Sequence, residues 1–297
     1  MKNMSSRRES LKKIAAGTAM LGIGTPIISA VVAGKSFQTE INTGKIRHSA
    51  CRWCYNDIPL ETLCAEGSKF GLESIDLIGP KDWPVVKKYG MTSAMGNGAE
   101  LGIAKGWNDP QYHETLVKNY LEIIPQAAGS GIPNIICLSG NRNGMDDETG
   151  LVNCTNGLKK ILGTAEKYKV NIVMELLNSK VDHKDYLCDH TAWGVELCNR
   201  IGSERFKLLY DIYHMQIMEG DVIRTIRENQ HSIAHYHTGG VPGRHEINDS
   251  QELYYPAIMK AIAETGFTGF VAQEFIPTRE NKLESLKEAL EICTVSI

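Results

Sequence analysis

The feature that most constrains the fold is a repeat that runs from Lys45 to the end of the chain. A short apolar run is followed by a longer stretch of helical period, and glycine or lysine–glycine separates one unit from the next. Eight apolar runs fit strands, at 46–51, 74–78, 90–95, 134–138, 171–176, 207–211, 233–237 and 269–274. Helical stretches lie between them, at 114–128, 151–168, 191–201, 222–228 and 253–265. Strands that alternate with helices predict an α/β fold.

The number of strands selects one α/β architecture. Eight strands over about 250 residues match the size of a (β/α)8 TIM barrel. The competing architecture, a doubly wound open sheet, usually carries a glycine-rich turn after its first strand. The first predicted strand is followed by Arg52-Trp53-Cys54, which is not such a turn. We therefore predict a (β/α)8 TIM barrel over residues 45–297.

Composition and charge limit the classes of ligand. Apolar residues make up 42% and charged residues 23%, as in ordinary soluble domains. The net charge of −3 gives no basic field for nucleic acid or an anionic membrane, and small neutral or acidic ligands stay open. The eight cysteines are too scattered for a disulfide framework. Cys51 and Cys54 have CxxC spacing without a second ligand pair, so we expect buried strand thiols.

Residues 1–33 are predicted to be a signal peptide of the twin-arginine type. Arg7 and Arg8 precede a weakly apolar, glycine- and alanine-rich stretch that ends in small residues at Ala30 and Ala33. Residues 34–44 fit a polar linker. The chain is therefore expected to be exported to the periplasm, already folded, by the twin-arginine machinery. A retained membrane anchor and an amphipathic helix are the alternatives.

The last four predicted strands each end in a side chain that can bind a metal. These side chains are Glu175, Asp211, His237 and Glu274. In a barrel, the carboxyl ends of the strands meet at one mouth, where the chemistry takes place. A single carboxylate there is usually a helix N-cap, but four ligands behind apolar runs indicate one site. Buried carboxylates need a partner, and three of them with an imidazole favour one Mn, Mg or Co ion, with Zn not excluded.

The segments around these positions resemble the hydroxypyruvate isomerases. The wider group is that of the xylose isomerase-like barrels, which includes ketose 3-epimerases, and the resemblance covers residues 45–280. Its motifs are 210–216 (Tyr-Asp-Ile-Tyr-His-Met-Gln), Glu219-Gly220, 243–247 (Gly-Arg-His-Glu-Ile), Glu175 with Asn178, and 273–275 (Gln-Glu-Phe). The family has a (β/α)8 barrel fold, which agrees with the strand count.

The resemblance also implies roles for single residues. It implies that the four strand-end residues hold the metal and that Glu175 and Glu274 also exchange protons with the substrate from opposite sides. Substrate contacts are implied for His214, Arg244, Glu246 and Asn178. Hydroxypyruvate isomerases tend to carry glutamine where this chain has His237, whereas ketose epimerases carry histidine, so the substrate stays open. Trp53 is expected to pack in the core rather than to line the pocket.

The implied activity is metal-dependent isomerisation or epimerisation of a sugar or hydroxy-keto acid. A carboxylate removes a proton beside the carbonyl, and the cation stabilises the resulting enediolate. Two alternatives remain. A lyase or hydrolase acting on 3-keto sugars or glycosides uses the same metal and the same proton removal. A non-catalytic sugar-binding barrel does not need both glutamates. We expect a small-molecule substrate and no nucleic acid as partners, and leave a homo-oligomer open.

Overall fold

The barrel strands are short and buried on both faces, because one face packs inside the barrel and the other packs against helices. The computed structural model describes residues 45–296. Seven strands pair in parallel in the order β2-β1-β7-β6-β5-β4-β3. They are β1 (Arg47–Cys51), β2 (Leu72–Asp76), β3 (Asn134–Cys137), β4 (Asn171–Glu175), β5 (Phe206–Asp211), β6 (Ile233–Thr238) and β7 (Phe270–Gln273).

The predicted strand at 90–95 closes the barrel in an irregular form. Isolated backbone bridges link this part of the chain to β2 on one side and to β3 on the other. The ladder is interrupted because side chains take the backbone groups of Ala94. Its N–H donates to the Ser74 hydroxyl (2.7 Å), and its carbonyl accepts from the Asn134 side-chain amide (2.8 Å). With this eighth member in place, the predicted (β/α)8 TIM barrel is confirmed.

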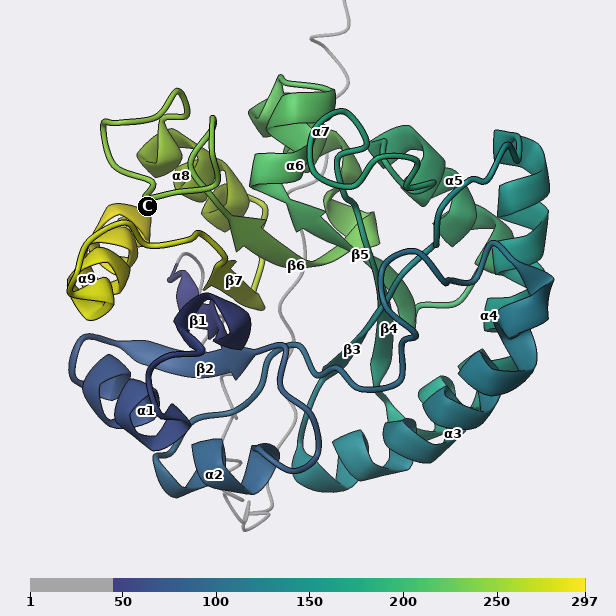
Figure 1. Cartoon of the computed structure of the whole chain (residues 1–297), viewed down its shortest axis with the longest axis horizontal. Helices are drawn as coiled ribbons and strands as arrows, with labels where there is room; N and C mark the ends of the chain where they lie inside the picture. Colours follow the sequence, from purple (N-terminus) through teal and green to yellow (C-terminus); the bar gives the residue numbers. More distant parts are fainter. Residues whose placement is uncertain (1–44, 297) are drawn as a thin grey trace, which may run out of the picture. The chain divides into compact units, whose positions relative to one another are not determined.

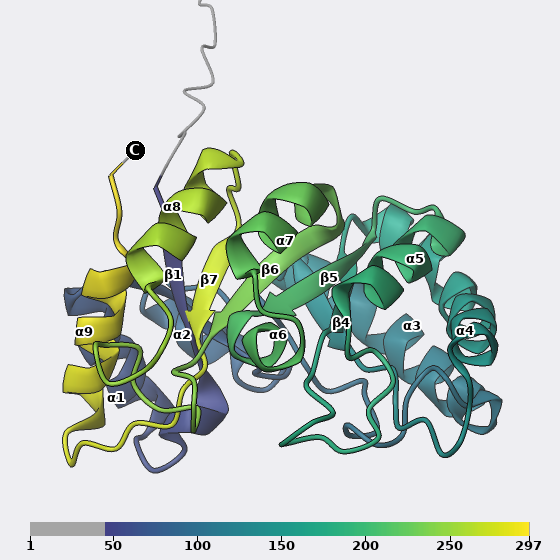
Figure 2. The ribbon, with the colours of Figure 1, turned by 90° about the horizontal axis from the view of Figure 1, so that it is seen from above.

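Helices surround the curled sheet (Figure 1 and Figure 2). They are α1 (Leu60–Lys69), α2 (Trp83–Lys88), α3 (His113–Ser130), α4 (Asp147–Tyr168), α5 (Thr191–Ile201), α6 (Ile212–Met218), α7 (Val222–Asn229), α8 (Tyr255–Glu264) and α9 (Lys282–Cys293). Short 3-10 turns are η1 (Arg52–Tyr55), η2 (Pro110–Tyr112) and η3 (Gln230–Ser232). The five predicted helical stretches fall on α3, α4, α5, α7 and α8.

Alternation along the strands separates the two faces of the sheet. Met174 on β4 packs in the large core under the helices, whereas its neighbour Val173 belongs to a small apolar cluster with Leu209. Because side chains repeat every second residue, Glu175 and Asp211 lie on the same face as these two residues, one step nearer the carboxyl ends of the strands. The site is therefore built directly above an apolar floor inside the barrel.

The predicted signal peptide at 1–33 and linker at 34–44 lie outside the described residues. No helix between residues 45 and 296 is long and apolar enough to cross a membrane. All eight cysteines lie within this range, and each is a free thiol. Seven of them are buried, and Cys198 is half-buried.

Candidate active site

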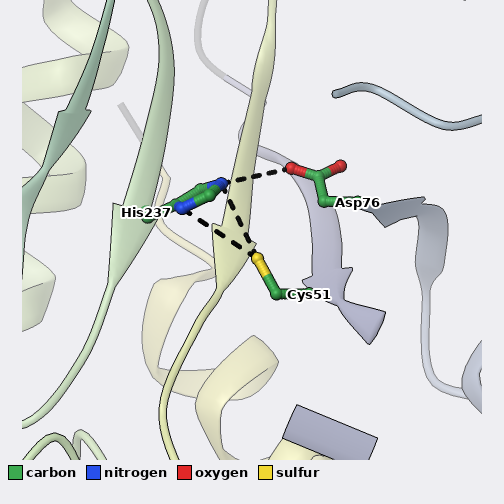
Figure 3. A group of neighbouring side chains, drawn as sticks. All are labelled: Cys51, Asp76 and His237. Carbon is green, nitrogen blue, oxygen red and sulfur yellow. Dashed lines mark hydrogen bonds and ion pairs between the residues drawn. The ribbon is translucent and has the colours of Figure 1, made fainter. Parts of the chain in front are cut away.

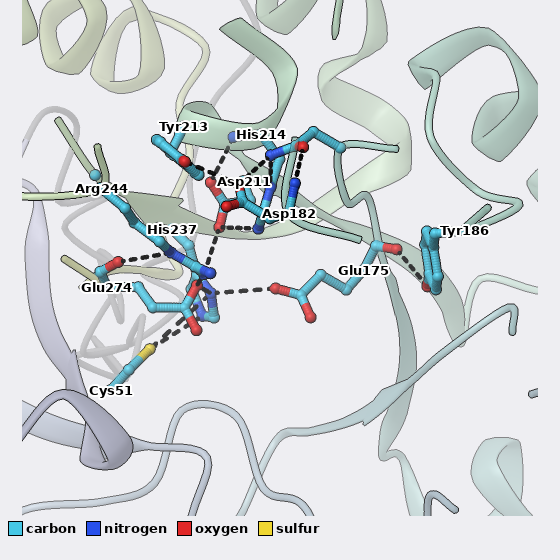
Figure 4. A network of polar contacts seen from close by, with 12 residues as sticks. Cys51, Glu175, Asp182, Tyr186, Asp211, Tyr213, His214, His237, Arg244 and Glu274 are labelled. Carbon is cyan, nitrogen blue, oxygen red and sulfur yellow. Dashed lines mark hydrogen bonds and ion pairs between the residues drawn. The ribbon is translucent and has the colours of Figure 1, made fainter. Parts of the chain in front are cut away.

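Four neighbouring strands deliver the predicted metal ligands to one point at the carboxyl end of the barrel. Glu175 ends β4, Asp211 ends β5, His237 lies near the end of β6, and Glu274 follows β7. One ligand atom from each lies within 4.8 Å of the others. Figure 4 shows the four side chains together. Each residue is at most 6% exposed. The structure thus brings together the whole set chosen from the sequence.

Asp211 acts as a helix cap and also faces the cluster. Its Oδ1 accepts the backbone N–H of His214 at the start of α6, at 3.1 Å. Its Oδ2 has no hydrogen-bond partner among the described residues, and neither has Nε2 of His214, which lies 3.7 Å away. Burial, with the charge of Glu274, raises the pKa of Asp211 well above its usual range. Buried polar atoms without partners are rare, so these two indicate a binding position.

The two glutamates of the cluster differ in how firmly they are held. Glu274 accepts from the Trp53 indole N–H, from His237 Nδ1 and from Arg244, each at 2.7–2.8 Å. Burial acts to raise the pKa of Glu274, but the positive charges of Arg244 and His237 outweigh it and hold the pKa well below its usual range. The one ion pair of the Glu175 carboxylate within residues 45–296 is with His237, at 3.6 Å, and burial raises the pKa of Glu175. Three short hydrogen bonds therefore hold the Glu274 carboxylate, whereas one longer contact holds that of Glu175.

The second ring nitrogen of His237, Nε2, meets buried polar side chains that were not predicted from the sequence. Nε2 of His237 lies 3.4 Å from Oδ2 of Asp76 and 3.6 Å from the Cys51 sulfur (Figure 3). Asp76 also accepts from the Ser49 hydroxyl (2.6 Å) and binds His235. Ligand atoms of Cys51, Asp76 and His237 lie close enough together to hold a metal. Both oxygens of Asp76, however, already have partners in Ser49 and His235. Asp76 therefore orients the His237 ring from the side opposite the ligand cluster.

Of the predicted substrate contacts, His214 and Arg244 adjoin the cluster. Nδ1 of His214 accepts from the Asn178 side-chain amide (2.7 Å), which leaves Nε2 as the N–H directed at the cluster. Asn178 thus supports His214. The Arg244 guanidinium lies 3.6 Å from Asp211 and over the rings of Trp53 and Tyr213, at 5.1 and 5.4 Å from the ring centres.

Glu246, also predicted as a substrate contact, lies away from the cluster. Its carboxylate accepts from the backbone N–H and the hydroxyl of Thr278 (2.7 and 2.9 Å) and from the Ser285 hydroxyl (2.8 Å). Burial acts to raise the pKa of Glu246, but these hydrogen bonds outweigh it and lower the pKa to about 2. Glu246 therefore ties the loop after β7 to the start of α9.

We expect Glu246→Gln to lower stability rather than turnover. The amide replaces an acceptor with a donor that faces donors, which costs about 1–3 kcal/mol. A lowered pKa stabilises the fold above the ordinary value of 4.5, and this contribution is lost as the pH falls toward about 2. Urea unfolding at pH 7 and pH 3 should show a gap from wild type that narrows in acid. Normal stability with impaired turnover would instead place Glu246 in the substrate site.

A cavity of about 400 Å³ opens onto the cluster. Its polar lining residues are Asn97, Glu100, Glu175, His183, Arg244 and Glu274. Its apolar lining residues are Trp53, Leu77, Ile103, Ile136, Leu138 and Leu177. Trp53 is 36% exposed and lines this cavity, so the expectation that it packs in the core is wrong. Its indole N–H needs the carboxylate of Glu274, and that partner lies at the barrel mouth.

Comparison with known proteins agrees with this geometry. Residues 85–294 match the family model described as xylose isomerase-like TIM barrel. The chain belongs to this family. It is 32% identical over 108 residues to a 2-oxo-tetronate isomerase of Cupriavidus necator, a match that covers 36% of this chain and 41% of the relative. The match thus spans about two fifths of that relative's length.

A longer match and a solved structure extend the likeness. The 2-oxo-tetronate isomerase of Pectobacterium atrosepticum is 23% identical over 234 residues, which are 75% of this chain and 88% of the relative. The apo structure of a 3-keto-D-glucoside 4-epimerase from Escherichia coli superposes with a TM-score of 0.70 at 15% identity, covering 83% of this chain and 98% of the other. This last likeness establishes the fold alone.

Proposed function

We propose that this protein is a metal-dependent isomerase or epimerase that transfers a proton beside the carbonyl of a sugar or hydroxy-keto acid. The observation that carries the proposal is a pair of buried glutamates facing one cavity, with Asp211 and His237 completing a four-residue ligand set. Membership of the xylose isomerase-like family and the names of the isomerase relatives support it.

The donor set fits a hard divalent cation. Three carboxylates and one imidazole are the ligands that Mn, Mg or Co prefer, and zinc accepts them too. Oδ2 of Asp211, which has no hydrogen-bond partner among residues 45–296, is the atom that most needs such a ligand. Glu175, Asp211, His237 and Glu274 would hold one ion. When bound, that ion polarises a substrate carbonyl and stabilises the negative charge that develops on its oxygen.

The side chains of the cluster supply the remaining steps. One glutamate accepts the proton from the carbon beside the carbonyl, and a glutamate returns a proton to the product. Arg244 and Trp53 fix Glu274, whereas the looser contacts of Glu175 let it follow the reacting carbon. The free N–H of His214 is placed to donate to a substrate oxygen. Two bases on one carbon give epimerisation, and transfer between two carbons gives isomerisation.

Product analysis by NMR tests this proposal. Metal-loaded protein is incubated with uncharged ketoses, hydroxy-keto acids and 3-keto glycosides, and a sample treated with EDTA is the control. We expect an epimer or an aldose–ketose isomer that forms only with the metal. Release of an aglycone would instead establish a lyase or hydrolase, and tight binding without any product would establish a sugar-binding barrel.

Export by the twin-arginine machinery belongs to the same proposal. We expect mature protein from outside the cytoplasm to lack residues 1 to about 33, because the charged, apolar and small-residue segments follow the order of a signal peptide. Replacing Arg7 and Arg8 with lysine keeps the charge and removes the arginine pair, so the precursor should stay in the cytoplasm. Cell fractionation and N-terminal sequencing check both points. Extracytoplasmic protein that begins at Met1 would contradict cleavage.

A further inference from the structure

We propose that the substrate is an uncharged ketose of six or more carbons, free or as a keto-glycoside, and that Glu100 makes the pocket disfavour sugar acids. This inference rests on the proposed function and narrows it. The relatives named 2-oxo-tetronate isomerases are named for a sugar acid, so the inference separates this chain from the substrate in those names.

The size of the cavity favours the larger substrate. If each non-hydrogen atom takes at most the ~30 Å³ that a water molecule occupies in the liquid, a three-carbon hydroxy-keto acid fills about half of 400 Å³. A six-carbon ketose fills most of it by the same measure. Six apolar side chains line the cavity, and the Trp53 ring among them suits the C–H face of a sugar.

The charges around the cavity disfavour a carboxylate. Arg244 is the one arginine or lysine among the described residues that line it, and this arginine is already bound to Glu274 and lies near Asp211. The three carboxylates of the cluster would be balanced by Arg244 together with one bound divalent cation. Glu100 then adds a negative charge to the lining, and no arginine or lysine of residues 45–296 pairs with it. A substrate carboxylate at the Glu100 side of the cavity would therefore meet repulsion, with no arginine or lysine left to pair with it.

The Glu100 carboxylate is held in place by its own loop. Its Oε2 accepts the backbone N–H groups of Gly98 (2.9 Å) and Ala99 (3.0 Å), which hold the carboxylate beside the cavity. Further along the same loop, the chain is packed against the segment that follows β3, where a Cβ on Gly106 would lie 2.3 Å from the nitrogen of Gly140. The charge of Glu100 is thus a fixed part of the pocket rather than a mobile surface group.

Substrate preference and binding are measured together to test this inference. With metal-loaded wild type, we expect kcat/KM for uncharged six-carbon ketoses to exceed that for three- and four-carbon hydroxy-keto acids by at least about tenfold. In Glu100→Gln, kcat/KM for the acids should rise about tenfold, and that for the ketoses should change by less than about threefold. Glu204→Gln, which removes the same charge from an exposed site, is the matched control.

A binding readout keeps the inference independent of turnover. Calorimetry with D-glycerate and D-mannitol, neither of which has an aldehyde or ketone group, should show glycerate binding about tenfold more tightly to Glu100→Gln and mannitol binding nearly unchanged. Faster turnover of the acids by wild type, or equal effects of the two Gln variants on glycerate, would overturn the inference and leave the proposed function intact. If no substrate of either class reacts, the proposed function fails, and the glycerate measurement still decides the role of Glu100.

Discussion

Glu175→Gln is expected to lower kcat by about 10²–10⁴-fold, the usual loss when a general base is removed. The amide keeps an oxygen that can bind the cation, but it can no longer accept a proton from carbon. The wild-type side chain makes a single 3.6 Å contact within the cluster, so the substitution should leave the fold unchanged. Steady-state kinetics measures the decrease in kcat, and elemental analysis measures how much metal the variant retains.

Glu274→Gln and the double variant provide the comparison. Glu274→Gln also loses an ion pair with Arg244, so it should affect turnover and the arrangement of the site together. The decreases in kcat of the two single variants should be far from additive in the double variant, because both residues serve one proton path. Near-wild-type turnover of Glu175→Gln with a full metal site would remove Glu175 from the mechanism and favour a sugar-binding barrel.

Asp211→Asn is expected to weaken binding of the divalent cation by about 100-fold or more, since even residues behind the ligands change metal affinity by about 10–100-fold. The new amide can still accept the His214 backbone N–H through its oxygen, which preserves the cap of α6. Its NH₂ group then replaces Oδ2 and faces the cation with donors instead of a charged acceptor. Titration against a chelating dye measures this loss.

Thermal unfolding without metal is the control for Asp211→Asn. It should be close to wild type, because relief of repulsion between buried carboxylates offsets any weakening of the cap. A variant that binds the cation as tightly as wild type would show that the metal, if bound, lies elsewhere. Loss of the folded state without metal would show that Asp211 is required for the fold.

The strand ends were predictable from the sequence because their signal is local. Glu175, Asp211 and His237 each close an apolar run, and the alternation of a strand fixes which face they share with Val173 and Leu209. Parallel strands of equal polarity then bring the ends together. The barrel and its ligand cluster therefore follow from patterns that span only a few residues each.

The residues that hold and shape the site could not be found in this way. Asp76 lies in a predicted strand, but its contact with His237 depends on the register between distant strands. Glu100 lies in a loop whose path is set by contacts with the end of β3, and loops carry no periodic signal. Glu246 lies in a motif that resembles one of the hydroxypyruvate isomerases, yet its position in space depends on Thr278 and Ser285.

Deuterium incorporation from solvent is the measurement that tests the central claim most directly. Metal-loaded protein is incubated with a reactive six-carbon ketose in D₂O, and each carbon is followed by NMR. Proton transfer by a glutamate should place deuterium on a carbon beside the carbonyl. Incorporation should stop after EDTA treatment and slow by about 10²-fold or more in Glu175→Gln. Turnover with complete retention of the original hydrogen would contradict proton transfer through the glutamates.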